Sequence, residues 1–200
     1  MPRTNKTHKT LYPAVVGLAA LILVGGLIAL KPYGTPLHWV IRGASLLGYL
    51  SVFLSIVSSA YMRELIRISG RPFIRVHHIL SITGLILITL HPLAVAWEYA
   101  NLRILLPTLD SWALFFQFGG QVVWPLIAVA SLAAALRKAI GRNWRVAHYL
   151  NYVAFWLATV HAILIGTDFQ YPVVKAISVV MSLATVAIFL QKRLRTRKSE

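Results

Sequence analysis

Six apolar runs follow one another along the chain, and the short connections between them hold nearly all of the charged residues. A helix rises about 1.5 Å per residue, so about 20 apolar residues cross a hydrocarbon core about 30 Å thick. Runs of this length are too long for strands in a protein core. The pattern predicts an all-α polytopic membrane protein, a bundle of six transmembrane helices over residues 13–30, 38–60, 76–97, 112–136, 146–166 and 172–190.

The composition agrees with a membrane protein that forms one domain. Hydrophobic residues make up 58% of the 200 residues and charged residues only 12%, whereas an average soluble domain is roughly 45–50% apolar. Six spans use nearly the whole length, so residues 1–200 are expected to form a single domain surrounded by membrane lipid, with no nucleic-acid partner. The chain has no Cys, so any metal must be held by His, Met or oxygen ligands.

The positive charges predict the orientation of the bundle. Of the 20 Lys and Arg residues, 16 fall in the N-terminal tail, the second loop, the fourth loop and the C-terminal tail. These four segments share one side if six spans alternate, and Lys and Arg concentrate on the cytoplasmic side of membrane proteins. We therefore expect both termini to be cytoplasmic in a multi-pass protein of the cell (plasma or inner) membrane. The other side receives Lys31, Arg42, Arg103 and Lys175.

Five of the seven histidines lie in the third and fifth spans: His77, His78, His91, His148 and His161. An ionisable side chain within a membrane indicates a functional site, because burying it without a partner is costly. His77 and His91 are 14 residues apart, which places them on nearly one helix face and near opposite membrane surfaces. His148 and His161 are 13 apart, so a kink, a π-bulge or a helix crossing must re-aim one of them.

The third and fifth spans run in the same direction if six spans alternate, so His77 lies level with His148, and His91 with His161. Each pair can present two imidazole nitrogens to a planar metal centre, and haem iron accepts this axial arrangement. A bare zinc or copper ion would need further ligands, and the spans offer no carboxylate or Cys. His78 is rotated by about 100° from His77, which favours a neighbour or a propionate contact over a ligand.

The stretches RVHHILSITGLILITLHPL (75–93) and WRVAHYLNYVAFWLATVHAILIGTD (144–168) resemble the ferric reductase-like transmembrane domain superfamily. It includes ferric-chelate reductases, the membrane domain of NADPH oxidases, and MsrQ, the haem-binding membrane subunit of a bacterial methionine sulfoxide reductase system. The resemblance implies two b-type haems, an inner one held by His77 and His148 and an outer one held by His91 and His161. MsrQ-like chains have Arg at the position of His77, so a histidine there favours two haems.

Haem propionates are anionic and need cationic partners near the membrane surfaces. Arg75 and Arg145 lie close to the inner histidine level, as do Arg71 and Arg142, although topology alone also explains cations there. Arg42 lies within the second span on the side that disfavours cations, and it either binds an outer propionate or extends to the headgroups. Four glycines either admit a porphyrin face or allow close helix packing: Gly48, Gly84, Gly119 and Gly120.

The predicted function is transmembrane electron transfer through two bis-histidine b-type haems. The chain has no dinucleotide-binding motif after a strand, so the donor is expected to be a separate flavoprotein, or a flavin or quinone bound at the cytoplasmic side. The acceptor outside is ferric iron or an extracytoplasmic redox partner. The alternatives are an MsrQ-like haem subunit of a methionine sulfoxide reductase system, a histidine-lined metal-ion transporter and a membrane assembly factor.

Overall fold

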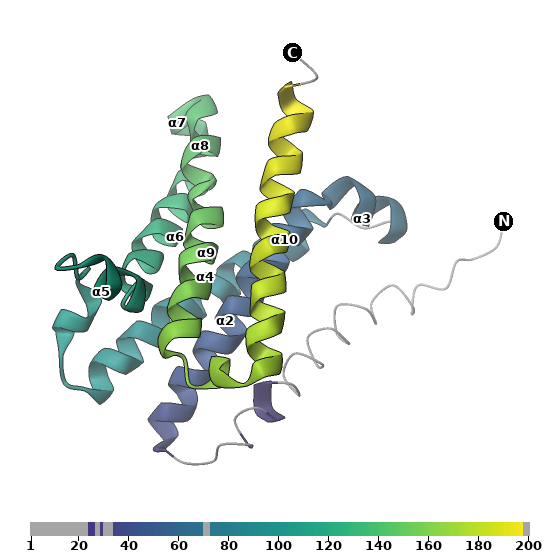
Figure 1. Cartoon of the computed structure of the whole chain (residues 1–200). Coiled ribbons are helices and arrows are strands. Elements are labelled where there is room, and N and C mark those ends of the chain that lie inside the picture. Colours follow the sequence, from purple (N-terminus) through teal and green to yellow (C-terminus); the bar gives the residue numbers. More distant parts are fainter. Residues whose placement is uncertain (1–23, 27–28, 30–33, 70–72, 198–200) are drawn as a thin grey trace.

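The computed structural model describes residues 24–26, 29, 34–69 and 73–197, and all of the regular secondary structure in these residues is helical (Figure 1). The first predicted span, 13–30, falls almost entirely outside the described residues, as does Arg71. The N-terminal tail lies outside them as well, so its predicted side of the membrane stays a prediction.

The described helices have the following bounds: α2 Pro36–Ala60, α3 Met62–Ser69, α4 Ile74–Glu98, η1 Leu102–Leu105, α5 Trp112–Gln117, α6 Gly120–Ala135, α7 Arg137–Ile140, η2 Gly141–Asn143, α8 Trp144–His148, α9 Leu150–Ile165, η3 Asp168–Gln170 and α10 Pro172–Arg197. Within the described residues, four segments are long and apolar enough to cross a membrane: Pro36–Ala60, Ile74–Glu98, Arg137–Ile165 and Pro172–Leu194. The chain is therefore an all-α, multi-pass membrane protein.

The fourth predicted span differs from expectation, because it is not one helix over 112–136. The structure divides it into α5 and α6, and α6 has only 16 residues. The break lies at Phe118 and Gly119, where the Gln121 N–H donates to the Phe118 carbonyl at 2.9 Å. Two consecutive glycines follow Phe118, and glycine costs about 1 kcal/mol relative to alanine inside a helix. The predominantly apolar sequence on both sides concealed this break.

The fifth predicted span, 146–166, contains the interruption that its histidine spacing required. Helix α8 ends at His148, and α9 begins at Leu150. Between them the Tyr149 N–H donates to both Arg145 and Val146 carbonyls, at 3.1 and 3.2 Å, so the turn is locally tightened. The helical axis is thus irregular directly after one of the two histidines.

Helices α2 and α4 pack closely against each other because glycines line their contact. A Cβ atom at Gly48 would lie 3.1 Å from Ile88 Cγ1, and one at Gly84 would lie 3.0 Å from Val52 Cγ2. Gly48 and Gly84 therefore allow close helix packing, which was one of their two predicted roles, the other being to admit a porphyrin face. A core cluster joins α2 to α6 and α9 and comprises Val52, Ile56, Val123, Ile127, Ala154, Phe155 and Leu157.

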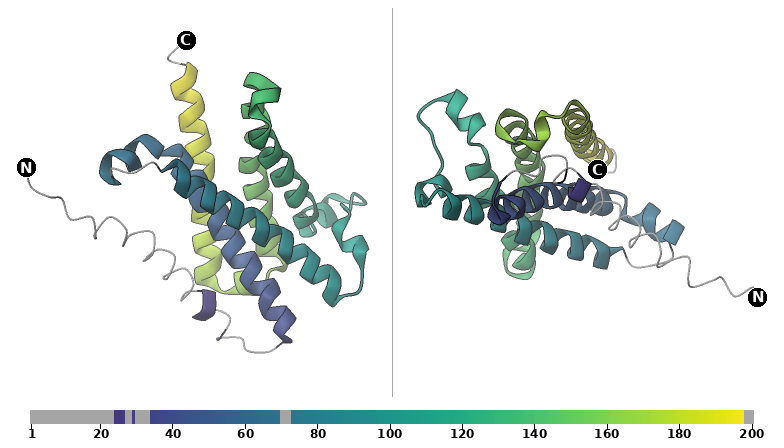
Figure 2. Two further views of the ribbon diagram at one scale, coloured as in Figure 1. Left: turned by 180° about the vertical axis from the view of Figure 1, so that it is seen from behind. Right: turned by 90° about the horizontal axis from the view of Figure 1, so that it is seen from below.

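The basic turns lie together at one end of the bundle, which we call the basic end and define by α3, α7, α8 and the C-terminal part of α10 (Figures 1 and 2). Lys192 Nζ donates to the Ala60 carbonyl, and the Tyr61 hydroxyl donates to Gln191 Oε1 at 3.3 Å. Both bonds join the last turns of α10 to the C-terminal end of α2. The opposite end holds the start of α2 and the connection between α4 and α5, and we call it the outer end.

Candidate functional site

The structure brings the predicted histidines together in the predicted pairs. His77 and His91 lie on α4, His148 is the last residue of α8, and His161 lies on α9. His77, near the start of α4, and His148, at the end of α8, form the pair at one level, and His91 and His161 line one cavity at the other. The first pair lies toward the basic end and the second toward the outer end; α4 supplies one histidine to each pair, and α8 and α9 supply the others.

All four of these histidines use Nδ1 in the same way. Each Nδ1 lies 2.8–3.1 Å from a main-chain carbonyl oxygen: Ser55 for His77, Ile41 for His91, Ala130 for His148 and Gln117 for His161. A carbonyl oxygen can only accept, so Nδ1 carries the proton in each ring. In a neutral imidazole Nε2 then holds the lone pair and is the nitrogen that can bind a metal.

The two helix pairs repeat the same arrangement. The acceptors Ile41 and Ser55 are 14 residues apart on α2, as His91 and His77 are on α4. The acceptors Gln117 and Ala130 are 13 apart, as are their two donor histidines on α8 and α9. In both cases the segment with the acceptors precedes the segment with the histidines and runs antiparallel to it. Because acceptors and histidines have the same spacing, both histidines of a segment can bond to the neighbouring segment.

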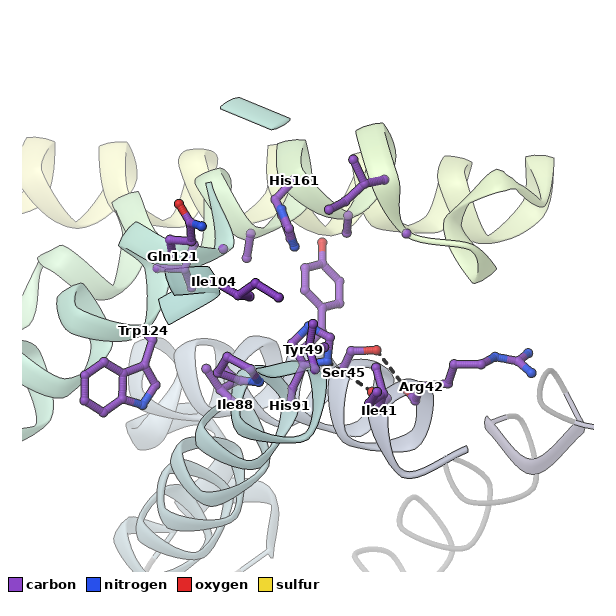
Figure 3. A pocket seen from close by; sticks show the side chains of 18 of the residues that line it. Ile41, Arg42, Ser45, Tyr49, Ile88, His91, Ile104, Gln121, Trp124 and His161 are labelled. Carbon is purple, nitrogen blue, oxygen red and sulfur yellow. Dashed lines mark hydrogen bonds between the residues drawn. The ribbon is translucent and has the colours of Figure 1, made fainter. Parts of the chain in front are cut away.

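A cavity of about 700 Å³ lies at the outer histidine level. His91 and His161 enter it from opposite sides, His91 from α4 and His161 from α9 (Figure 3). Most of the lining is apolar, and polar groups include Tyr49, Gln121 and Trp124. A few polar groups in an apolar cavity of this size are typical of a site for a cofactor or a small molecule.

The break between α5 and α6 supports His161 directly. Since Gln121 N–H donates to Phe118, no main-chain N–H of the described residues donates to the Gln117 carbonyl. That oxygen accepts instead from His161 Nδ1 at 2.8 Å, the shortest of the four bonds. Gly120 leaves room for the ring, because a Cβ atom there would lie 2.8 Å from His161 Nε2.

The inner level is more polar around its α4 histidine. Ser55 Oγ lies 3.1 Å from His77 Nδ1 and 2.6 Å from Ser81 Oγ, while Ser81 Oγ donates to the His77 carbonyl at 2.8 Å. Ser55 therefore accepts from His77 through its hydroxyl as well as its carbonyl and donates to Ser81. Near His148, the Asn151 amide nitrogen lies 3.3 Å from Nδ1 and donates to the His148 carbonyl at 3.0 Å.

His78 differs from the four paired histidines. Its side chain is exposed, no hydrogen bond reaches it within the described part of the chain, and its ring centroid lies 5.8 Å from that of His77. Arg75 and Arg145 are also exposed at the basic end, and the Arg145 guanidinium lies 6.0 Å from the centroid of the Trp144 ring. The His78 ring is thus a neighbour of His77, and the binding of haem propionates by these three residues stays a prediction.

Arg42 has a partner that the sequence reasoning missed. Arg42 Nη2 lies 2.6 Å from Asp168 Oδ1, and Nε donates to Oδ2 at 3.0 Å. The two residues are only 4% and 3% exposed, and both line the outer cavity. The ion pair joins the start of α2 to η3, between α9 and α10. Arg42 therefore lies in a buried, two-point ion pair at the cavity wall.

Among the described residues, no three His, Cys, Asp or Glu side chains form a group that could hold a bare metal ion. Each histidine level instead offers two imidazoles, the number that completes the six-coordination of an iron porphyrin.

No protein-family model, no curated protein and no solved structure matches the chain. The functional argument therefore depends on the geometry of the site.

Proposed function

We propose that this protein carries electrons across a membrane through two b-type haems, one at each histidine level. His77 and His148 would hold the haem at the basic end, and His91 and His161 the haem at the outer end. The observation that carries the proposal is the shared hydrogen-bond pattern, in which every Nδ1 donates to a carbonyl and every Nε2 keeps its lone pair. The resemblance of residues 75–93 and 144–168 to ferric reductase-like domains supports the same assignment.

The residues of the outer level fit a haem by their chemistry and by the space around them. Two imidazoles enter a mostly apolar cavity of about 700 Å³ from opposite sides, and Gly120 leaves open the space that a Cβ atom would fill beside His161. A bound haem iron would take up and release one electron. Arg42 is the proposed outer propionate contact, and its ion pair with Asp168 would fix the guanidinium.

The direction of transfer follows from the proposed topology. We place six spans in the membrane, including residues 13–30, with the basic end and both termini in the cytoplasm. Arg75 and Arg145 would bind propionates of the inner haem, and His78 would be a further contact. The donor would be a separate flavoprotein, or a flavin or quinol at the cytoplasmic side, and the acceptor would be ferric iron or a redox partner outside.

The haem content of the purified protein tests the proposal. We expect a reduced-minus-oxidised spectrum of six-coordinate b-type haem and a ratio of two haems per chain, measured by extraction of the porphyrin. Protein purified from haem-supplied cells with no absorbance in the visible range would overturn the assignment. Uptake of a metal ion into proteoliposomes by such colourless protein would select the transporter instead.

Replacement of Gly120 tests how His161 is held. A Cβ atom in Gly120→Ala would push against the imidazole 2.8 Å away and strain its bond to Gln117. Loss of such an orienting bond costs roughly 10–100-fold in metal affinity, so the variant should release the outer haem selectively during haem titration. The control is Gly26→Ala, where a new Cβ atom meets nothing within 4 Å. Equal haem retention by both variants would contradict the role of Gly120.

A further inference from the structure

The connection between α4 and α5, residues 99–111, exposes large apolar side chains although it is too irregular to span a membrane. Leu102, Leu106 and Leu109 are 75%, 64% and 76% exposed, and Tyr99 at its start is 68% exposed. A loop between two spans that projects into water would instead carry polar side chains. Clustered exposed apolar side chains mark a surface that contacts a membrane or another protein.

This surface continues the lipid-facing stripe of α4. Exposed side chains recur along α4 at spacings of three and four residues and end in Trp97, which is 79% exposed. Such spacing places them on one helix face, which the described residues leave exposed, and on a spanning helix such a face contacts lipid. The stripe comprises Ile79, Ile82, Ile86, Leu90, Leu93 and Trp97. The connection follows directly at its outer end, where the Glu98 carboxylate lies 3.6 Å from His38 Nδ1.

The other side of the same connection closes the outer cavity. Ile104 and Leu105, both in η1, are partly buried and line the cavity that His91 and His161 enter. The Thr108 N–H donates to Gln121 Oε1 at 2.9 Å, and Gln121 is itself a lining residue. The connection thus has an inward face on the cavity and an outward apolar face, and a bond to α6 holds it there.

Its start is also fixed by the backbone. Ala100 has a φ angle of 47°, and the N–H groups of Ala100 and Asn101 donate to the Trp97 and Ala96 carbonyls at 3.1 and 3.0 Å. This is the usual capping geometry at a helix C-terminus, but with alanine where glycine is preferred. The Asn101 side chain then accepts from the Arg103 N–H at 3.0 Å. The chain is therefore turned at the end of α4 into a defined path across the cavity.

We propose that residues 99–111 lie in the headgroup–acyl boundary of the outer leaflet and form the membrane-facing wall of the outer cavity, with phospholipid as their partner. Aromatic residues with a polar edge favour this boundary, and Tyr99 and Trp112 flank the segment. Arg103 is exposed beside Leu102, where its charge meets lipid phosphate. Continuity with the α4 stripe favours lipid over a soluble protein, which would have to bind beside the membrane on a surface that lipid already covers.

The absence of Cys from the sequence allows a direct test with one spin label per chain. We would label Leu106→Cys in full-length protein in phosphatidylcholine nanodiscs and measure collisions with oxygen, which concentrates in lipid, and with a water-soluble nickel chelate. The matched controls are Ile82→Cys, on the lipid-facing stripe of α4, and Lys138→Cys, on the exposed turn α7. We expect the label at 106 to resemble that at 82 in losing the nickel signal and gaining the oxygen signal.

Nickel accessibility at 106 equal to that at 138 would overturn the proposal, because the segment would then lie in water or await a soluble partner. A second variant tests the wall itself. In the background Ile104→Cys, replacing Leu102, Leu106 and Leu109 by Ser should raise nickel accessibility at 104, since the outward face would leave the lipid. Unchanged accessibility at 104 would also contradict the proposal. Neither measurement depends on haem, so both outcomes are independent of the proposed electron transfer.

Discussion

Replacing His161 by alanine is expected to remove one haem and leave the other. The ratio of haem to chain should fall from two to one, and the amplitude of the reduced-minus-oxidised spectrum should fall by about half, because each b-type haem contributes a similar absorbance. The reason is geometric, since only His91 and His161 enter the outer cavity among the four paired histidines. Porphyrin extraction and optical spectroscopy on the same sample measure both quantities.

Double variants make this expectation sharper than a single replacement can. His91→Ala combined with His161→Ala should retain one haem, as each single variant does, because both residues hold the same haem. His77→Ala combined with His161→Ala should retain none. His78→Ala is the comparison that separates a ligand from a neighbour: His78 is exposed and adjacent in sequence to His77, and loss of its proposed propionate contact should weaken the inner haem far less than loss of a ligand. A loss of haem in His78→Ala similar to that in His77→Ala, or two haems retained by His161→Ala, would contradict the pairing.

The long helices and the histidine levels could be predicted because both follow from local patterns. Hydropathy and length identify spans such as 38–60, which the structure gives as Pro36–Ala60. Alternation of spans then sets which histidines share a level, and the entry of His91 and His161 into one cavity follows that rule. The irregular turn at Tyr149 could be anticipated as well, since 13 residues of ideal helix would turn one histidine away from the other.

The features that hold the histidines could not be read from the sequence. Every residue has a carbonyl, so nothing distinguishes Gln117 or Ala130 as an acceptor until the helices are placed side by side. The break before α6 was missed because glycine is common in membrane helices and apolar residues lie on both sides of it. The break depends on packing against α9. The Gln117 carbonyl accepts from His161, and the absence of a Cβ atom at Gly120 leaves room for the His161 ring.

The ion pair between Arg42 and Asp168 could not be predicted from the sequence either. The two residues are 126 positions apart, and each has a sufficient local explanation, Arg42 as a residue near the outer headgroups and Asp168 as part of an outer loop. Burial changes this picture, because neither side chain can be solvated at 4% and 3% exposure. Two such charges must be bound together, since an unpaired buried charge is far more costly than an unpaired one at the surface.

Asp168→Asn is therefore expected to destabilise the protein strongly. The carboxylate that accepts from two nitrogens of Arg42 would be replaced by a neutral amide, and breaking a buried ion pair by removing one partner costs about 3–5 kcal/mol. Unfolding in detergent, followed by circular dichroism against denaturant, measures the loss. Asp110→Asn is the control, because Asp110 is exposed and its replacement should change the free energy of unfolding by less than about 0.5 kcal/mol.

The double variant Arg42→Met, Asp168→Leu separates the structural role of the pair from a role toward haem. Apolar residues of similar size often replace a buried ion pair without loss of stability, so the double variant should recover most of the stability that Asp168→Asn loses. If Arg42 also binds a propionate of the outer haem, the recovered fold should still bind that haem more weakly than the unaltered protein. A stable double variant with unchanged haem affinity would show that Arg42 serves only to join α2 to the loop before α10.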